Sequence, residues 1–67
     1  MSLADRVKQK RIELGLTQTE AALNAGITQQ SWQSIEKGDT RKPRNIIGIA
    51  KALKCDPDWL MNGGAFM

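Results

Sequence analysis

Apolar residues along the chain recur at helical spacing, and no alternation typical of strands competes with them. Leu3, Val7 and Leu14 form the first apolar stripe. Four shorter stretches with the same character follow, separated by glycine, proline or polar residues. The pattern predicts an all-α fold, a compact domain of five short helices.

Capping residues mark where each helix should begin and end. Two segments fit a capping box, in which the first residue and an acidic residue three positions later satisfy each other's backbone N–H groups. Glycines follow four of the expected helices, as is usual after a helix end. Ser2, Thr17, Thr28, Asn45 and Asp56 are the expected N-caps. The helices should span about 3–14, 18–25, 29–37, 46–53 and 57–62.

A single core is expected, because 67 residues lie near the lower limit for a domain without staples. We therefore expect one domain over 1–67, with 62–67 as a frayed tail. Its core should contain Leu3, Val7, Leu14, Leu16, Ala22, Leu23, Ile27, Trp32, Ile35, Ile46, Ile49, Leu53, Trp59 and Leu60.

The composition excludes several classes of protein. Cys55 is the only cysteine and there is no histidine, so we expect no internal disulfide, metal site, cofactor, small-molecule ligand or histidine-based catalysis. No apolar run approaches the roughly 20 residues of a membrane span, and the N-terminus is charged by its fifth residue. These features predict a cytoplasmic protein that is not an enzyme.

Positive charge is concentrated at two places in a chain of net charge +3. The segment KGDTRKPR, residues 37–44, has four basic residues and one acidic residue, and 12–35 have no basic residue. The other basic cluster contains Arg6, Lys8, Lys10 and Arg11. Basic runs are often only solvated surface, but here they flank an uncharged helix, which favours a nucleic-acid partner.

The expected second and third helices have the pattern of a helix-turn-helix. Gly26 in the connecting NAGIT supplies the positive φ that a tight turn between helices needs. The third helix carries Gln29, Gln30 and Gln33 opposite its apolar side. A glutamine amide presents a donor beside an acceptor, which matches the major-groove edge of adenine. We therefore predict that these three side chains contact DNA bases, the alternative being a merely soluble helix face.

Several motifs resemble the helix-turn-helix domains of lambdoid phage repressors and Cro proteins over nearly the whole length. They are RVKQKRIELGLTQTE, TQQS, IEKGDTRKPR and DPDWL. The resemblance implies a homodimer that represses transcription by binding a palindromic operator in double-stranded DNA, with one third helix in each half-site. We expect no second domain for oligomerisation or regulated cleavage, and on that expectation the chain resembles Cro more than a full-length repressor.

The resemblance also implies roles for individual residues. Gln18 and the loop from Arg41 to Arg44 would contact the DNA backbone, with Arg44 at the narrowed minor groove of the operator centre. The charges of Lys10 and Lys42 are expected to neutralise phosphates as well.

Three positions depart from the family pattern. Ala21 stands where a large aliphatic residue is usual, Trp32 where isoleucine or valine is usual, and Asn45 where an aromatic residue is common. Ala21 and Trp32 suggest a compensating exchange of volume, although two independent changes would give the same sequence. Asn45 is expected to serve as a helix cap.

Two further contacts are expected. Arg11 and Glu36 each border an apolar stripe, and a charge at a core edge needs a partner; the family resemblance also implies an ion pair between them. At the C-terminal end, Trp59, Leu60 and Met61 offer more apolar surface than one short helix can bury on one side. We expect Trp59, Met61 and Asn62 in a weak dimer contact that DNA strengthens, with core packing as the alternative for Trp59.

The sequence thus predicts a Cro-like repressor of a bacteriophage acting in a bacterial host. Two alternatives are an antitoxin or restriction-control regulator with the same fold, and a helical adaptor that binds proteins. The amide-rich face lacks the aromatic anchors that a protein-binding surface usually has.

Overall fold

The computed structural model describes residues 2–40 and 42–63, which form five α-helices and no strand. They are α1 (Leu3–Glu13), α2 (Gln18–Ala25), α3 (Gln29–Lys37), α4 (Ile46–Ala52) and α5 (Pro57–Asn62). The predicted all-α fold is confirmed. Within this part of the chain, every helix is too short or too polar to cross a membrane.

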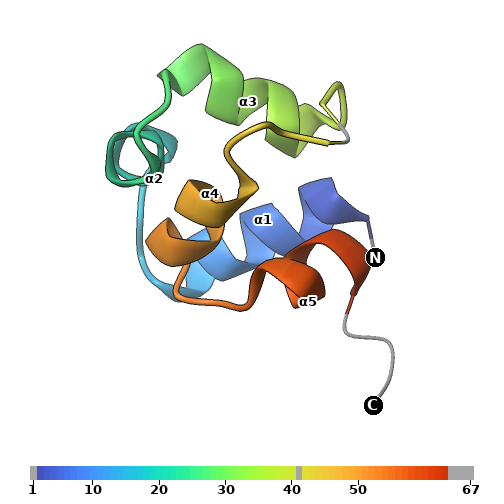
Figure 1. Ribbon diagram of the computed structural model, residues 1–67. Coiled ribbons are helices and arrows are strands. Elements are labelled where there is room, and N and C mark those ends of the chain that lie inside the picture. Colours follow the sequence, from blue (N-terminus) through green and yellow to red (C-terminus); the bar gives the residue numbers. More distant parts are fainter. Residues whose placement is uncertain (1, 41, 64–67) are drawn as a thin grey trace.

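α1 and α4 lie between α3 on one side of the molecule and α5 on the opposite side (Figure 1). α3 lies on one side of α1 and α5 on the other, while α2 stands crosswise to α3 and packs against α3 and α4. The segment between α3 and α4 returns across the open side of the molecule. This arrangement leaves the outer face of α3 uncovered.

Local sequence explains where the first three helices begin. Both predicted capping boxes are present: Ser2 and Asp5 exchange hydrogen bonds at α1, and Thr17 and Glu20 do so at α2. The Thr28 side chain accepts a hydrogen bond from the backbone N–H of Ser31 at the start of α3. These side chains satisfy N–H groups that lack partners within their own helices.

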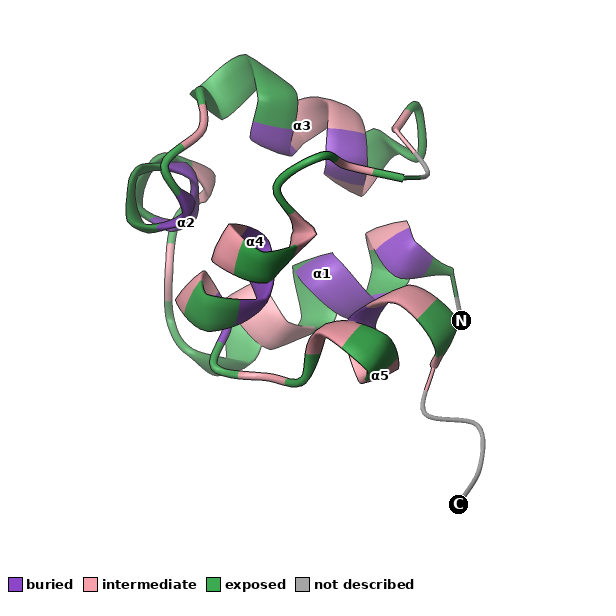
Figure 2. Ribbon diagram, in the orientation of Figure 1, coloured by how far each residue is buried: buried purple, intermediate pink, exposed green. Residues whose placement is uncertain are grey.

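The core lies where all five helices meet, as Figure 2 shows in purple. Its largest fully buried side chains are Val7, Trp32, Ile49, Leu53 and Leu60, all predicted core residues. Four others, Leu16, Ile27, Ile46 and Trp59, are half-buried against it.

The prediction of a core position is wrong for two residues. Leu23 is 77% exposed, because α2 turns its alanine side, with Ala21, Ala22 and Ala25, inward. Leu14 is 38% exposed because it follows the last turn of α1, where the helical stripe no longer continues. Alanines on the buried side let the backbones of neighbouring helices approach closely.

The expected cap at Asn45 is also wrong. Its side chain makes no capping hydrogen bond in α4; instead, its amide Nδ2 donates to the carbonyl of Ala25 at 2.7 Å. That carbonyl lies in the last turn of α2, where no N–H of the same helix is available to it. Asn45 therefore ties the segment before α4 to the turn between α2 and α3.

Gly48 faces this link. A Cβ built at Gly48 would lie 2.9 Å from the Ala25 carbonyl oxygen and 2.7 Å from the Asn45 amide. The backbones of α2 and α4 are thus close enough that a methyl group has no room at this position.

We predict that Gly48→Ala lowers the free energy of unfolding by about 1–3 kcal/mol, the usual range for overpacking. The loss should occur although alanine favours a helix over glycine by about 1 kcal/mol. Urea denaturation measures the change, with Lys51→Ala at an exposed position of α4 as the control. A Gly48→Ala protein as stable as wild type would contradict this packing.

Candidate nucleic-acid interface

The first turn of α3 presents amide side chains to solvent. Gln29 and Gln30 are exposed, and Gln33, one turn after Gln29, is half-buried. The opposite side of α3 is apolar and inserts Trp32 and Ile35 into the core. α3 is therefore fixed by its buried side, and its first turn remains free to meet a ligand.

The turn before α3 fixes the direction in which this surface points. Gly26 has φ of 76°, in the left-handed region that favours glycine. The backbone N–H of Ile27, the residue after Gly26, donates to the carbonyl of Ala22 and so fixes the turn at the end of α2. The two helices are thereby held crosswise, the arrangement of a helix-turn-helix.

The basic segment after α3 lies beside it. Lys42 and Arg44 are exposed, and Asn45 holds the end of this segment against α2. Arg41, a predicted backbone contact, lies outside the described residues. Cations therefore adjoin the amide-bearing helix, as the charge pattern of the sequence suggested.

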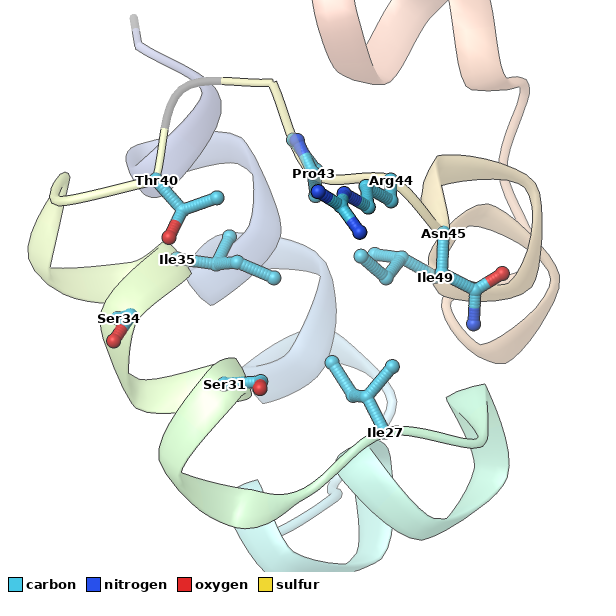
Figure 3. A pocket seen from close by; sticks show the side chains of 9 residues that line it. All are labelled: Ile27, Ser31, Ser34, Ile35, Thr40, Pro43, Arg44, Asn45 and Ile49. Atoms are coloured by element: carbon cyan, nitrogen blue, oxygen red, sulfur yellow. The ribbon is translucent and has the colours of Figure 1, made fainter.

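A pocket of about 280 Å³ separates α3 from this segment. Figure 3 shows Ser31 and Ser34 of α3 on one side and Pro43, Arg44 and Asn45 on the other. Its floor is apolar and includes Ile27, Ile35 and Ile49. Short hydroxyl side chains thus replace amides on the side of α3 that faces the basic segment.

Glu36, near the end of α3, forms the ion pair expected with Arg11 of α1. Arg11 Nε donates to Glu36 Oε2 at 2.6 Å, and a second guanidinium nitrogen donates to Oε1 at 3.2 Å. A third donates to the carbonyl of Leu16 at 2.9 Å. The Arg11 and Glu36 side chains are only 14% and 5% exposed, so the pair is well shielded from water.

Two more donors converge on the same carboxylate. The indole Nε1 of Trp32 donates to Glu36 Oε2 at 2.6 Å, and Gln18 Nε2 donates to Oε1 at 3.1 Å. Sequence reasoning missed both contacts. The four-residue spacing of Trp32 and Glu36 was a usable signal, because such positions are neighbours on a helix.

These contacts decide the pKa of Glu36. Burial alone would raise it, but hydrogen bonds from Arg11, Trp32 and Gln18, with the charge of Arg11, outweigh burial and hold the pKa below its ordinary value. Glu36 therefore stays ionised while it joins α1, α2 and α3.

Two members of the N-terminal basic cluster, Arg6 and Lys10, lie against α5. Lys10 lies 5.4 Å from the centre of the Trp59 ring and 3.5 Å from Glu13. Arg6 is buried, and its guanidinium donates to the carbonyls of Leu60 and Met61 in α5. The structure therefore brings Lys10 to α5, and α5 lies on the other side of α1 from α3 (Figure 1).

The residues expected at a dimer contact lie together on α5. Trp59 and Met61 are half-buried and Asn62 is exposed. Trp59 is covered in part by Lys10, so only some of its ring is open to another molecule.

Ala21 and Trp32, two of the residues that depart from the family pattern, both lie in the core and are completely buried.

Comparison with known proteins gives consistent matches. A family model described as helix-turn-helix matches residues 7–60. The HTH-type transcriptional regulator for conjugative element R391 of Providencia rettgeri is 36% identical over 62 residues, which cover 92% of this chain and 29% of that protein. Repressor protein C2 of Salmonella phage P22 is 26% identical over 62 residues, which cover 91% of this chain and 29% of that protein. The chain spans under a third of the length of both relatives.

A solved structure matches closely as well. It is the P22 c2 repressor protein in complex with a synthetic operator, with a TM-score of 0.88 and 25% sequence identity. The match covers 94% of this chain and 97% of that one. All five helices therefore belong to one shared arrangement.

We predict that the stabilising effect of Glu36 depends on pH. Because its pKa is lowered by folding, its contribution is present above about pH 4.5, the ordinary value, and is lost as pH falls through the folded-state pKa. Glu36→Gln should cost roughly 3 kcal/mol of unfolding free energy at pH 7, and less at pH 3.

Urea denaturation of wild type and Glu36→Gln between pH 7 and pH 3 measures this difference. Glu13→Gln is the matched control, because Glu13 is an exposed carboxylate in a surface pair with Lys10. A difference between wild type and Glu36→Gln that stays constant over this range would contradict the role of the ionised carboxylate.

Proposed function

The chain belongs to the helix-turn-helix family, and from this we propose that it is a transcriptional repressor that binds double-stranded DNA by sequence. Its resemblance to lambdoid Cro proteins and repressors is confirmed, although the matches do not separate Cro from repressor. The single observation that carries the proposal is the first turn of α3, where Gln29 and Gln30 are exposed on the same helix that faces Arg44 of the cationic segment across a pocket.

In this proposal α3 lies in the major groove and its first turn meets base edges. Gln29 and Gln30 each pair an amide donor and acceptor with N6 and N7 of adenine. Gln33 lies on the side of Gln29 one turn later and contacts a neighbouring base. Specificity for adenine would then come from uncharged groups, which contribute little to binding of random DNA.

Affinity for the DNA backbone would come from a separate set of groups. Lys42 and Arg44 are exposed beside α3, and with Arg41 they would neutralise phosphates, Arg44 at the minor groove of the operator centre. Gln18 at the start of α2 would donate to one more phosphate. The contact of Lys10 with a phosphate stays a prediction; in the structure its side chain lies over the Trp59 ring beside α5.

The relatives suggest the biological setting. One regulates a conjugative element and another is a phage repressor. We therefore assign this chain to the control of a phage or another mobile element in a bacterial cytoplasm. A Cro-like role, with two copies on a palindromic operator, is the specific form of this assignment.

The two copies would meet through α5. Half-sites about one DNA turn apart require two third helices at fixed spacing, and Met61 and Asn62 are the accessible side chains at the end of α5. Such a small contact is weak, so the protein would be monomeric when free and would pair on the operator.

We predict that Gln29→Ala relaxes base preference at one position of each half-site and weakens the preferred site by roughly 1–3 kcal/mol. Selection of bound sequences from a random DNA pool, with wild type and variant in parallel, measures the preference. Lys42→Ala is the matched variant: it should weaken all sequences alike and reduce the dependence of log affinity on log salt by about 0.9.

Identical selected sequences for wild type and Gln29→Ala would remove α3 from base reading. Affinity for random DNA that hardly changes between low and moderate salt would contradict a DNA-binding function altogether. That second result would favour the adaptor alternative.

We predict that Met61→Asp lowers affinity for a full operator, because it places negative charge at the contact between two copies. Binding to an isolated half-site should be unchanged, and the free energy of unfolding should fall only in part, because Met61 is half-buried against the core. Titrations of full-site and half-site duplexes measure both, with Lys54→Asp on the exposed surface as a charge control. Full-site binding as tight as wild type would place the dimer contact elsewhere.

A further inference from the structure

Trp32 combines a core position with a polar contact. Its side chain is completely buried, yet its indole Nε1 donates to Glu36 Oε2 at 2.6 Å. Isoleucine or valine at this position could fill space but could not donate a hydrogen bond. The indole N–H is therefore the feature that distinguishes Trp32 from an aliphatic residue.

The indole N–H restricts the Glu36 side chain. A glutamate at a helix surface has several rotatable bonds and can turn its carboxylate toward water. The completely buried ring of Trp32 is fixed by packing, so a hydrogen bond from it holds the carboxylate in one orientation. In that orientation one oxygen accepts from Trp32 and Arg11, and the other accepts from Arg11 and Gln18.

Among the residues that hydrogen-bond in sequence from Trp32 through Glu36, Gln18 lies nearest to the surface. It is half-buried at the first position of α2, and it uses its amide nitrogen to reach Glu36 at 3.1 Å. An amide nitrogen has two hydrogens, so one remains for another acceptor. A glutamine held by one hydrogen loses less conformational entropy when the other binds a ligand.

We infer that Trp32 is a positioning residue for DNA binding: its indole N–H orients the Glu36 carboxylate, which holds the Gln18 amide ready to donate to a DNA phosphate. The inference rests on the proposed function, in which Gln18 contacts the backbone. A buried core side chain would thus set the affinity for DNA through Glu36 and Gln18.

The test removes only the N–H. Benzothienylalanine has nearly the shape of tryptophan, with sulfur in place of the N–H group. Introduced at position 32 alone, it should lower affinity for one fixed duplex about tenfold, near the low end of a hydrogen bond to a charged group. The same replacement at Trp59 is the matched control. Both replacements are measured on an isolated half-site duplex, where the α5 contact between two copies plays no part, and the change at Trp59 should leave that affinity unchanged.

A double-mutant cycle with Gln18→Ala tests whether Trp32 acts on DNA affinity through Gln18. Gln18→Ala alone should weaken binding about as much as the change at Trp32. The doubly altered protein should bind no more weakly than Gln18→Ala, because Trp32 acts only through Gln18. Random duplexes should show the same pattern, since a phosphate contact carries no sequence information.

A second readout separates positioning from mere packing. The pKa of Glu36, followed by NMR of its labelled side-chain carboxyl, should rise when the indole N–H is absent and stay unchanged in the Trp59 control. All DNA titrations are made at a temperature where circular dichroism shows each variant folded, so lost stability cannot imitate lost affinity.

The outcomes are distinct. If Gln18→Ala weakens binding but the change at Trp32 does not, the inference is overturned and the proposed function stands. Additive effects, or an unchanged pKa of Glu36, also overturn it, because Trp32 then acts by another route or only fills space. If Gln18→Ala binds as tightly as wild type, the phosphate contact in the proposed function fails and the inference fails with it. The salt dependence of wild type still tests DNA binding independently.

Discussion

The carboxylate of Glu36 is the contact on which the orientation of α3, and with it the proposed DNA-binding surface, depends. It accepts hydrogen bonds from α1, α2 and its own helix, through Arg11, Gln18 and Trp32. Isolated burial of a carboxylate is costly, and here the cost is offset because both oxygens are fully used. The result is a third helix attached near its C-terminal end, so that its first turn projects outward.

Close backbone packing holds the rest of this surface in place. Alanines on the inner side of α2 and Gly48 on α4 let the two helices approach until Asn45 reaches the Ala25 carbonyl. That hydrogen bond links the basic segment to the turn of the helix-turn-helix. The groups that would contact phosphates and those that would contact bases are therefore positioned by one rigid unit.

The distribution of charge also follows from packing. In the sequence, the N-terminal basic cluster looks equivalent to the basic segment after α3. In the structure Arg6 binds carbonyls of α5, Arg11 binds Glu36 and Lys10 lies over Trp59. These cations stabilise contacts between helices, while Lys42 and Arg44 remain exposed in the segment that follows α3.

The sequence by itself determined the helices and the helix-turn-helix, because caps, turn glycines and apolar periodicity act between residues a few positions apart. Ser2, Thr17 and Thr28 cap as predicted for this reason. Only the tertiary structure decided that Leu23 faces solvent, that Asn45 bonds to α2 instead of capping α4, and that Trp32 and Gln18 share Glu36 with Arg11. Those outcomes depend on which helix approaches from outside the local segment, and a side chain with several possible partners binds the one that packing brings within reach.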